Sequence, residues 1–544
     1  MAESARAEVS DLDRNLIERV NVGDILLRTA EVHPQRVAVV DGVRRLSYAQ
    51  WHREVDHLGH ALLGLGLAPG AVVAVMARNR TELLSCYFAC ARAGLVCAPV
   101  NLGLRPAEIA WCLRDAAAQV LIIDAELADA ARQVLQQDLP ALRQRVWFHA
   151  TAPLQSPFAP PPGDLTWAAL LAQGEARSQG RPLEVAVADR ATVQLLYTSG
   201  TTGNPKGVLT SHLAVTMAGL SNALAMQATP GYTALVALPL FHCAMLNSMA
   251  VPLAIAGGTL VLTQGFDAHQ AAALLDAEQV HTMVLLPMMY GQLLADPRLS
   301  QRRFASVKRA LYAMAPMPEP RLHEIHAMFP NADVVLGSGQ TEFTPATCMQ
   351  RPEHQWSKAA TWGTATAMTR VAIMDDQGRL LPRGETGELV YRGPQVMSGY
   401  LNLPEVSRDS LRHGWFHSGD VAHIDEDGAI WFKDRTKDVI KTGGENVASI
   451  EVERCLMAHP AVAEAAVVGA PHPHWGEAIT GVVILKPGTD AASVDEAALI
   501  AHCRQQLAGF KVPKAVRIVA EFPRTGTGKI QKHLIRSELS SLFQ

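Results

Sequence analysis

A stretch between residues 195 and 207 carries the residue types of a phosphate-binding loop. Hydroxyl side chains offer hydrogen-bond donors, glycines let backbone N–H groups approach an anion closely, and Lys206 adds a compact positive charge. The apolar run from Val193 to Tyr197 precedes the loop and predicts a buried strand. The hydroxyl and glycine positions are Thr198, Ser199, Gly200, Thr201, Thr202, Gly203 and Gly207. The pattern therefore predicts a cradle for phosphate groups rather than a flexible surface loop.

This loop differs from a Walker A loop. That motif places Ser or Thr directly after its lysine, where the hydroxyl binds Mg²⁺. Here Gly207 follows Lys206, so the metal-binding hydroxyl is absent from its usual place. The sequence therefore predicts a phosphate site of a different kind.

The loop resembles the signature of the adenylate-forming superfamily, which includes acyl-CoA synthetases, aryl-CoA ligases, luciferases and the adenylation domains of peptide synthetases. The run from Ser338 through Gln340 to Glu342 resembles the family's Tyr-Gly-x-Thr-Glu motif. The resemblance implies that Thr341 hydrogen-bonds phosphate and that Glu342 coordinates Mg²⁺, a cation that favours carboxylate and phosphate oxygens. Ser338 replaces the family's aromatic residue, so the ring that flanks adenine in relatives is missing here.

Later motifs resemble the family's ribose, hinge and CoA elements. Asp420 follows a glycine at an expected strand end, as suits an acidic residue that bonds two ribose hydroxyls, although a turn aspartate would look the same in isolation. By resemblance Asp420 binds ribose, Arg435 contacts ribose or phosphate, and Lys437 is the hinge residue. The hinge run ends at Lys441, and the glycines that follow are implied to line the tunnel for the narrow pantetheine arm of CoA. These glycines are Gly443 and Gly444.

Near the end of the chain, Lys529 lies among glycines and threonines in a run that resembles the superfamily's catalytic-lysine loop. Ile530 follows it, so Lys529 is not a Walker lysine either. Outside the complete set of motifs, the ordinary interpretation of Lys529 would be a solvated surface lysine. With that set, the resemblance implies a catalytic group that consists of Thr198, Glu342, Lys437 and Lys529.

The run that ends in His242 looks like the superfamily's acyl-pocket motif, in which an aromatic residue or His lines the pocket. On its position alone, His242 would be a hydrogen-bonded core histidine. Amino-acid adenylation domains place Asp just after this motif to hold the substrate ammonium, and no carboxylate follows His242 here. We therefore expect a carboxylic acid without an α-amino group. The pocket candidates are His242, Ala244, Met314, Ser338 and Phe343.

The chemistry that the resemblance implies follows from charge. A carboxylate is anionic and therefore a poor electrophile, so its attack on the α-phosphate of ATP must first make an acyl-adenylate, with Mg²⁺ and Lys529 neutralising the developing charge. The resemblance implies an AMP-forming acyl-CoA synthetase that uses ATP, CoA and a hydrophobic fatty or aryl acid. The alternative is a stand-alone adenylating enzyme that loads the acyl group onto a carrier protein.

Composition narrows the class of protein. The chain has 544 residues, 49% hydrophobic and 18% charged, which describes an ordered globular protein too long for one core. The net charge of −4 gives no basic footprint for nucleic acid. The sequence shows no signal peptide and no apolar window of about 18 residues that would predict a membrane span. None of the eight cysteines forms a CxxC pair, and Cys86 and Cys90, four apart in an apolar helix-like run, are expected to pack in the core; a reducing cytoplasm fits. The sequence leaves the oligomeric state open, a homodimer included.

Strand and helix signals alternate between residues 24 and 190, which predicts an α/β fold with a parallel sheet covered by helices on both faces. Helices are expected at 46–65, 80–93 and 106–117, and strands at 71–76, 96–100 and 120–123. Residues 1–434 are expected to form the ATP- and acyl-binding domain. Residues 435–544 are expected to form a small, mobile α+β lid domain.

Overall fold

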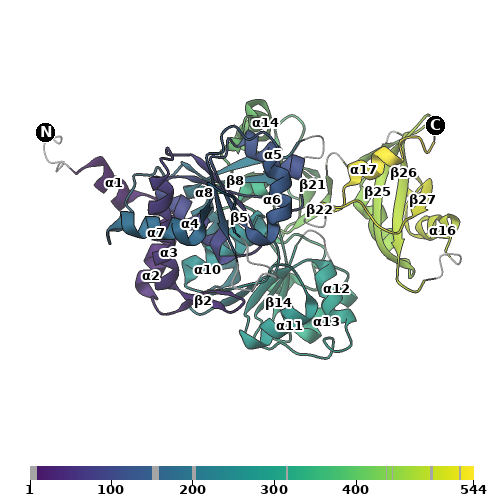
Figure 1. Ribbon diagram of the computed structural model, residues 1–544. Helices are drawn as coiled ribbons and strands as arrows, with labels where there is room; N and C mark the ends of the chain where they lie inside the picture. Colours follow the sequence, from purple (N-terminus) through teal and green to yellow (C-terminus); the bar gives the residue numbers. More distant parts are fainter. Residues whose placement is uncertain are drawn as a thin grey trace, which may run out of the picture. The chain divides into compact units, whose positions relative to one another are not determined.

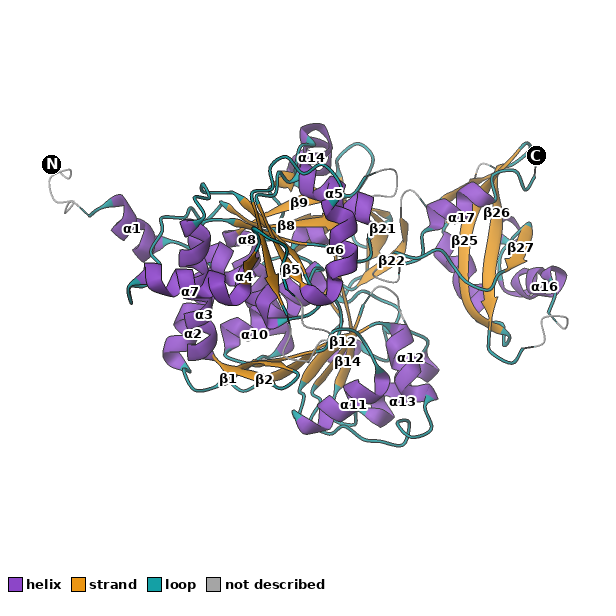
Figure 2. Cartoon of the chain, in the orientation of Figure 1, coloured by secondary structure: helices purple, strands orange, loops and turns teal. Residues whose placement is uncertain are grey.

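The computed structural model describes residues 9–149, 159–198, 204–313, 317–435, 438–443, 445–489, 494–525 and 529–543 (Figures 1 and 2). The chain divides into two compact units. Among the described residues, the first unit holds those up to 198, those from 204 to 370 and those from 392 to 416, and the second holds 371–391 and those from 417 onward. The predicted lid boundary at residue 435 falls inside the second unit and stays a prediction.

The first unit contains an eight-stranded sheet in the order β20-β9-β8-β4-β3-β5-β6-β7. Its strands from β8 to β7 are parallel, and β9 and β20 extend one edge in antiparallel fashion. Their bounds are β3 (Val72–Met76), β4 (Val96–Pro99), β5 (Val120–Asp124), β6 (Gln144–Phe148), β7 (Leu165–Thr166), β8 (Thr192–Thr198), β9 (Lys206–Ser211) and β20 (Gly399–Tyr400).

A second sheet of the first unit has nine strands in the order β16-β15-β14-β13-β12-β10-β11-β1-β2. Strands β1 and β10 to β14 run parallel, and the outermost strands are antiparallel. The bounds are β1 (Val37–Asp41), β2 (Arg44–Ser47), β10 (Thr233–Val236), β11 (Thr259–Leu262), β12 (Thr282–Leu285), β13 (Arg309–Tyr312), β14 (Asp333–Gly339), β15 (Ala346–Met349) and β16 (Thr364–Ala365).

Helices cover both faces of the eight-stranded sheet, as the alternating pattern predicts. In β3, Val73 and Val75 join the core with α3 and α4, whereas Ala74 and Met76 join the core with α5 and α6. Figure 2 shows these helix pairs on opposite sides of β5. The helices of this unit are α1 (Asp11–Glu18), α2 (Val22–Val32), α3 (Tyr48–Gly64), α4 (Thr81–Ala93), α5 (Pro106–Asp115), α6 (Ala128–Leu135), α7 (Trp167–Ser178), α8 (His212–Met226), α9 (Cys243–Met245), α10 (Val251–Ala256), α11 (Ala268–Ala277), α12 (Pro287–Ala295), α13 (Glu319–Met328) and α14 (Pro404–Ser410).

Local sequence explains the best defined of these helices. Ser47 and Gln50 form a reciprocal capping box that begins α3. Trp51, Val55 and Leu58 recur at helical spacing along α3 and are fully buried. Cys86 and Cys90 lie on α4, where both are fully buried, so the prediction that they pack in the core is confirmed.

The second unit holds two mainly antiparallel sheets. The first has the order β18-β17-β19-β21-β22, and the second has β24-β23-β26-β25 with β27 beside β26. The bounds are β17 (Arg370–Met374), β18 (Leu380–Leu381), β19 (Gly387–Arg392), β21 (Phe416–Ile424), β22 (Ile430–Arg435), β23 (Ile440–Thr442), β24 (Glu445–Val447), β25 (Val462–His472), β26 (Gly476–Leu485), β27 (Ala515–Ile518), α15 (Ser449–Met457), α16 (Glu496–Gln506) and α17 (Lys532–Glu538). The predicted α/β class with a smaller C-terminal α+β region is confirmed.

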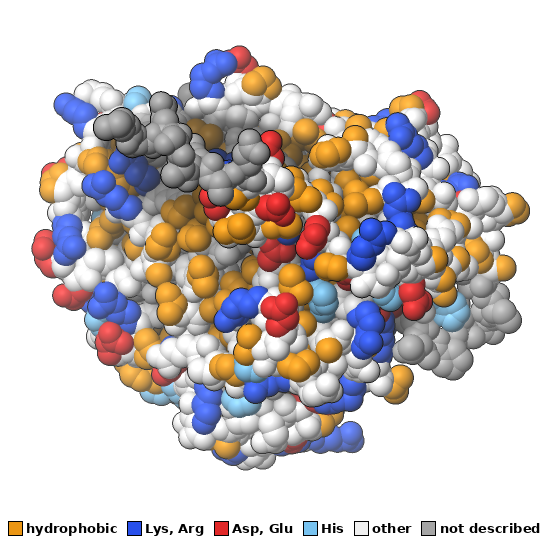
Figure 3. Space-filling model, turned by 90° about the vertical axis from the view of Figure 1, so that its left-hand side faces the viewer, with side chains coloured by type: hydrophobic (Ala, Val, Ile, Leu, Met, Phe, Trp, Pro, Cys, Tyr) orange, Lys and Arg blue, Asp and Glu red, His pale blue; other side chains and the backbone are white. Residues whose placement is uncertain are grey.

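The surface is mixed in character. On the face shown in Figure 3, hydrophobic side chains are spread over the middle, with charged side chains among them and around them. Within the described part of the chain, no helix combines the length and the hydropathy needed to cross a bilayer.

Candidate active site

The predicted phosphate cradle joins two antiparallel strands. Thr198 ends β8, Lys206 begins β9, and the two are cross-strand partners, with the Thr198 hydroxyl 3.4 Å from the Lys206 carbonyl. In a Walker A loop the glycine-rich turn leads into a helix, whose N-terminus binds phosphate. Here a strand follows, so loop donors and Lys206 would have to meet the phosphates without a helix terminus. The loop residues 199–203 lie outside the described residues.

The other predicted groups of the first unit follow the carboxyl ends of parallel strands. Thr198 ends β8, His242 follows β10, and Thr341 follows β14. Ligands of open α/β sheets bind beyond the carboxyl ends of the strands, so these positions suit a binding site.

A direct contact joins the acyl-pocket motif to the Thr-Glu motif. Cys243 Sγ lies 3.1 Å from Thr341 Oγ1. Burial raises the pKa of the Cys243 thiol to about 12, so the sulfur stays protonated at neutral pH. Sequence reasoning gave Cys243 no role in the site and counted it only among the residues after His242 that carry no carboxylate. Its place directly after His242 was the one signal that could have marked it as part of the site.

Glu342 lies in a 3₁₀ turn, Thr341–Phe343, and is held at two points. The Tyr400 hydroxyl donates to Glu342 Oε1 at 2.8 Å, and the Met397 N–H donates to the Glu342 carbonyl at 2.8 Å. The Lys206 ammonium nitrogen lies 5.3 Å from the centre of the Tyr400 ring, within range of a cation–π interaction. Burial, followed by the Glu342 charge, raises the pKa of Tyr400 far above its usual range, which keeps the phenol a hydrogen-bond donor.

The side-chain oxygens of Thr341 and Glu342 suit a magnesium ion that binds together with a nucleotide. Among the described residues, no group of three or more His, Cys, Asp and Glu side chains could hold a metal ion. Mg²⁺ in nucleotide sites usually takes one or two carboxylates and completes its shell with phosphate and water oxygens. Thr341 and Glu342, neighbours in sequence and both half-buried, carry a hydroxyl and a carboxylate that offer oxygen ligands of that kind.

Hydrogen bonds fix the chain on both sides of His242. The Ala244 N–H donates to His242 Nδ1 at 3.1 Å, which leaves Nε2 as the donor nitrogen of a neutral ring. Upstream, Asn79 accepts from the Leu240 N–H at 2.7 Å and donates to the Leu238 carbonyl at 2.9 Å. Asn79 is buried and 161 residues from Leu240, so sequence reasoning gave no sign of this role.

A π-helical turn, Leu246–Ala250, follows α9. Such turns occur often at functional sites. Its Asn247 exchanges two amide hydrogen bonds with Gln194 of β8, at 3.0 and 2.9 Å, and the Tyr87 hydroxyl donates to Gln194 at 2.8 Å. This buried network connects the π-helical turn to the strand that carries Thr198.

The remaining pocket candidates differ in burial. Ala244 and Ser338 are half-buried, whereas Phe343 is fully buried and its ring centre lies 6.1 Å from that of Phe416. Gln340 begins the turn before Thr341 and is half-buried. Met314 lies outside the described residues. The pocket roles of these residues stay predictions.

In the second unit, the two predicted ribose residues form an ion pair. Asp420 and Arg435 are cross-strand partners in β21 and β22, with Arg435 Nε 2.6 Å from Asp420 Oδ1. Asp420 lies inside β21 rather than at a strand end, and Gly419 before it has φ +70°, a conformation that favours glycine. Glu388 accepts from the Gly419 N–H at 3.0 Å and pairs with His417 Nδ1 at 2.7 Å. Glu388 thus holds the backbone beside Asp420.

The predicted CoA and lysine elements also lie in the second unit. The Lys441 N–H donates to Glu477 Oε2 at 2.7 Å, and the Gly443 N–H donates to the Trp475 carbonyl at 2.9 Å. Lys529 is exposed, and its backbone makes two hydrogen bonds with Thr525, at 2.8 and 3.2 Å. Lys437 and Gly444 lie outside the described residues.

Comparison with known proteins decides the family. The family model for AMP-binding enzymes matches residues 26–401, and the model for the AMP-binding enzyme C-terminal domain matches residues 451–529. This chain belongs to the AMP-binding enzyme family. The predicted membership of the adenylate-forming superfamily is therefore confirmed.

Relatives of this AMP-binding enzyme span nearly its whole length. It is 34% identical over 517 residues to a feruloyl-CoA synthase from an Amycolatopsis species, covering 95% of this chain and 98% of the relative. It is 31% identical over 531 residues to the fatty acid–[acyl-carrier-protein] ligase ScoC of Streptomyces coeruleorubidus, covering 94% and 96%. The crystal structure of ATP-bound MatB from Rhodopseudomonas palustris matches with a TM-score of 0.85 and 27% identity, covering 97% and 100%. The predicted class, an ATP-dependent acid–CoA ligase, is confirmed.

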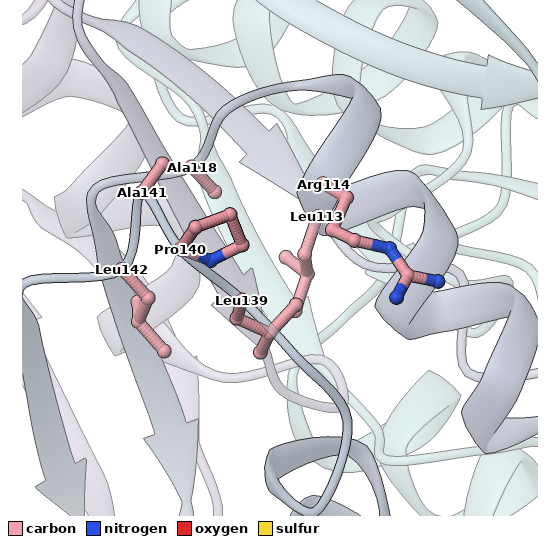
Figure 4. Close-up of a pocket in the computed structure, with 7 residues that line it drawn as sticks. All are labelled: Leu113, Arg114, Ala118, Leu139, Pro140, Ala141 and Leu142. Atoms are coloured by element: carbon pink, nitrogen blue, oxygen red, sulfur yellow. The ribbon is translucent and has the colours of Figure 1, made fainter.

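Two cavities of this AMP-binding enzyme are lined by residues outside the predicted site. One, of about 20 Å³, has room for a single water molecule. Figure 4 shows Leu113 of α5 facing Leu139 and Pro140 across it, with the Arg114 guanidinium pointing away. A wider hollow of about 350 Å³ lies beside β6 and includes Arg143 and Asp164. Neither is lined by a residue predicted to bind nucleotide or acid.

Proposed function

We propose that this enzyme activates a hydrophobic carboxylic acid without an α-amino group, fatty or aryl, and transfers it to CoA. The contact between Cys243 and Thr341, 3.1 Å long, is the observation that carries the proposal. It brings the motif assigned to the acid against the motif assigned to phosphate and metal. A carboxylate held by the first would lie next to an α-phosphate held by the second.

The proposed reaction has two displacement steps, one at the α-phosphorus of ATP and one at the carbonyl carbon of the acyl group. First, a carboxylate oxygen of the acid attacks the α-phosphorus of ATP, and the bond to the bridging oxygen breaks to release pyrophosphate. Second, the CoA thiolate attacks the acyl carbonyl and AMP leaves with its phosphate oxygen. The catalytic demand is to hold two anions together, so positioning and charge neutralisation dominate.

Each predicted residue then has a defined task. The hydroxyls of Thr198 and Thr341 and the Lys206 ammonium would bind phosphate oxygens, and Asp420 with Arg435 would bind ribose. Glu342 would hold Mg²⁺, which supplies positive charge to the phosphates when bound. Lys529 would neutralise charge that develops on the α-phosphate in the first step. The glycines around residue 443 would accommodate the pantetheine arm.

The acid is proposed from the residues after His242. Cys243, Ala244 and Met245 offer no carboxylate for a substrate ammonium, and Cys243 is protonated because burial raises its pKa to about 12. The feruloyl-CoA synthase relative supports an aryl acid and CoA as the acceptor. The eight cysteines are free thiols, which supports a reducing, cytoplasmic setting.

Transfer to a carrier protein is the second candidate, and the relative named as a fatty acid–[acyl-carrier-protein] ligase favours it. Both candidates share the adenylation step and differ in the acceptor. The acceptor therefore has to be tested separately from the acid.

The test uses the full chain with ATP and Mg²⁺ and a panel of straight-chain and aryl acids. Pyrophosphate release in the absence of acceptor measures adenylation, and mass spectrometry with CoA or a phosphopantetheinylated carrier protein identifies the product. We expect pyrophosphate release with aryl or fatty acids and an acyl-CoA product. Release with amino acids alone, or no release with any acid, would overturn the proposal, and acylation of the carrier alone would select the second candidate.

A further inference from the structure

Tyr400 joins two parts of the phosphate site at opposite ends of one side chain. Its hydroxyl donates to Glu342 Oε1 at 2.8 Å, and its ring lies beneath the Lys206 ammonium nitrogen at 5.3 Å. Lys206 begins β9 directly after the phosphate cradle, and Glu342 is the candidate magnesium ligand. The three residues are separated by 136, 58 and 194 positions in sequence, and the fold brings them together.

We propose that Tyr400 is a positioning residue for the magnesium–nucleotide site. It aims the Glu342 carboxylate and keeps the Lys206 ammonium beside the cradle. This inference rests on the proposed function for the ligand, a nucleotide with its divalent cation, and it goes beyond it in naming the group that orders the metal ligand.

The physical reason lies in the freedom of a glutamate side chain. The terminal torsion of Glu is broad, so an unsupported carboxylate samples many orientations. A phenol that donates to Oε1 fixes the carboxylate plane and leaves the lone pairs of the second oxygen to a cation. Mg²⁺ demands near-ideal octahedral geometry, so its binding is sensitive to this orientation. Loss of such a supporting partner typically weakens metal binding by about 10–100-fold.

The ring has a second effect. Lys206 and Glu342 carry opposite charges, and each contacts a different end of Tyr400. The negative face of the Tyr400 ring attracts the Lys206 ammonium through a cation–π interaction. Without the ring, Lys206 and Glu342 could approach and neutralise each other, and both would then be lost to the substrate.

The backbone around Tyr400 is held firmly enough for this role. Strand β20 pairs with β9 through Gly399 with Leu209 and Tyr400 with Val208. The Leu401 N–H donates to the Gly207 carbonyl at 2.8 Å, which ties this segment to the residue after Lys206.

A contact with α14 completes the support. The Tyr400 N–H donates to Ser407 Oγ at 2.8 Å. Gly399 has φ +148°, and a Cβ there would lie 3.1 Å from Ser407 Oγ, so glycine permits this close approach. Backbone on both sides of Tyr400 is thus fixed independently of its side chain.

The test compares Tyr400→Phe, which removes only the hydroxyl, with Tyr290→Phe as the control. The Tyr290 hydroxyl also makes a hydrogen bond, to the Leu311 carbonyl at 3.0 Å, and Tyr290 belongs to none of the predicted binding motifs. Binding of Mn²⁺ in the presence of a non-hydrolysable ATP analogue, measured by electron paramagnetic resonance, reports on the metal site without turnover. We expect about tenfold weaker Mn²⁺ binding for Tyr400→Phe and unchanged binding for Tyr290→Phe.

A double-mutant cycle with Glu342→Gln distinguishes positioning from a general structural effect. If Tyr400 acts through Glu342, the Tyr400→Phe change has no further effect on Mn²⁺ binding in the Glu342→Gln background. Equal effects of Tyr400→Phe in both backgrounds would overturn the proposal, and so would wild-type Mn²⁺ binding in Tyr400→Phe. Circular dichroism melting of each variant verifies that the compared proteins are folded.

The experiment separates this inference from the proposed function. If the wild-type protein releases no pyrophosphate with any acid but Tyr400→Phe still weakens Mn²⁺ binding, the proposed function fails and the positioning role stands. If the wild-type protein is active and Tyr400→Phe binds Mn²⁺ normally, the positioning role fails and the proposed function stands.

Discussion

Arg435 and Asp420 face each other across β22 and β21, with Arg435 Nε 2.6 Å from Asp420 Oδ1. The Asp420 side chain is 1% exposed and that of Arg435 is 32% exposed. The arginine therefore provides the positive charge that compensates a carboxylate buried away from water. Both residues were assigned to the ribose from sequence. Their pairing means that neither can be changed without altering the other.

Replacement of Arg435 by Ala should therefore raise the KM for ATP by about tenfold, or about 1.4 kcal/mol of binding free energy. The reason is that Asp420 would lose the partner that orients it. Pyrophosphate exchange as a function of ATP concentration measures this effect. Arg408→Ala is the control, because Arg408 and Glu405 form an exposed surface pair of little energetic value. An unchanged KM for ATP in Arg435→Ala would refute the assignment.

Lys529→Ala should lower the rate of adenylate formation by about 10²–10³-fold, because one electrostatic interaction with the developing charge is lost. A chemically synthesised acyl-adenylate should still be converted to the thioester, since that step needs no triphosphate. Single-turnover assays of the two half-reactions measure both rates. Lys486, an exposed lysine of the same unit, provides the control variant Lys486→Ala. Full adenylate formation in Lys529→Ala would contradict the predicted role.

Gly443→Ala should raise the KM for CoA several-fold and leave pyrophosphate release unchanged. Gly443 has φ +59°, and a Cβ there would lie 3.0 Å from Trp475 Cε3, so alanine would both strain the backbone and displace the ring. Thioester formation at varied CoA concentration measures the effect. Gly488→Ala is a suitable control, because Gly488 has φ +83° with nothing within 4 Å of the added Cβ. An equal rise in both variants would rule out a local role for Gly443.

Stability should fall as the pH drops from about 6.5 to about 4, in part through His212. Burial lowers the pKa of His212 to about 4, and His212 Nδ1 accepts from the Val22 N–H at 3.2 Å. The unfolded chain, with an ordinary His pKa near 6.5, binds more protons over this range than the folded chain does, so stability rises with pH.

The wild-type protein should therefore lose about 2 kcal/mol more than His212→Asn between pH 7 and pH 5. Asparagine can also accept from the Val22 N–H, but it does not titrate. Urea denaturation at both pH values measures the difference. A wild-type and a variant protein with the same pH dependence would show that His212 contributes nothing to it.

The elements of the parallel sheets follow from local pattern. The observed strand Val72–Met76 and helix Thr81–Ala93 each differ by only one residue from the predicted bounds. The prediction succeeded because elements buried on both faces are marked by a continuous apolar run in the sequence. Strand β9 was missed. Its six residues include Gly207 and two hydroxyl residues, so its short apolar segment merges with the loop before it and the helix after it.

The sequence predicted the motifs of the candidate site but not the residues that contact them. Thr341 and Glu342 belong to a recognisable motif, but their partners lie on other elements, Cys243 at 98 positions and Tyr400 at 58 positions along the chain. No local pattern encodes such contacts, because they arise where strands from different parts of the chain end together. For the same reason, the sequence did not predict the role of Asn79, whose amide makes hydrogen bonds with the turn before His242.

The reciprocal amide pair between Gln194 and Asn247 has a practical consequence for enzyme engineering. Under the proposed function, a change of the π-helical turn made to admit a bulkier acid would also disturb β8, the strand that ends in Thr198, so we expect a broader substrate range to be accompanied by weaker ATP use. Mutant libraries that keep Asn247 and vary positions on the opposite side of the turn should broaden the range of accepted acids with the least loss of turnover.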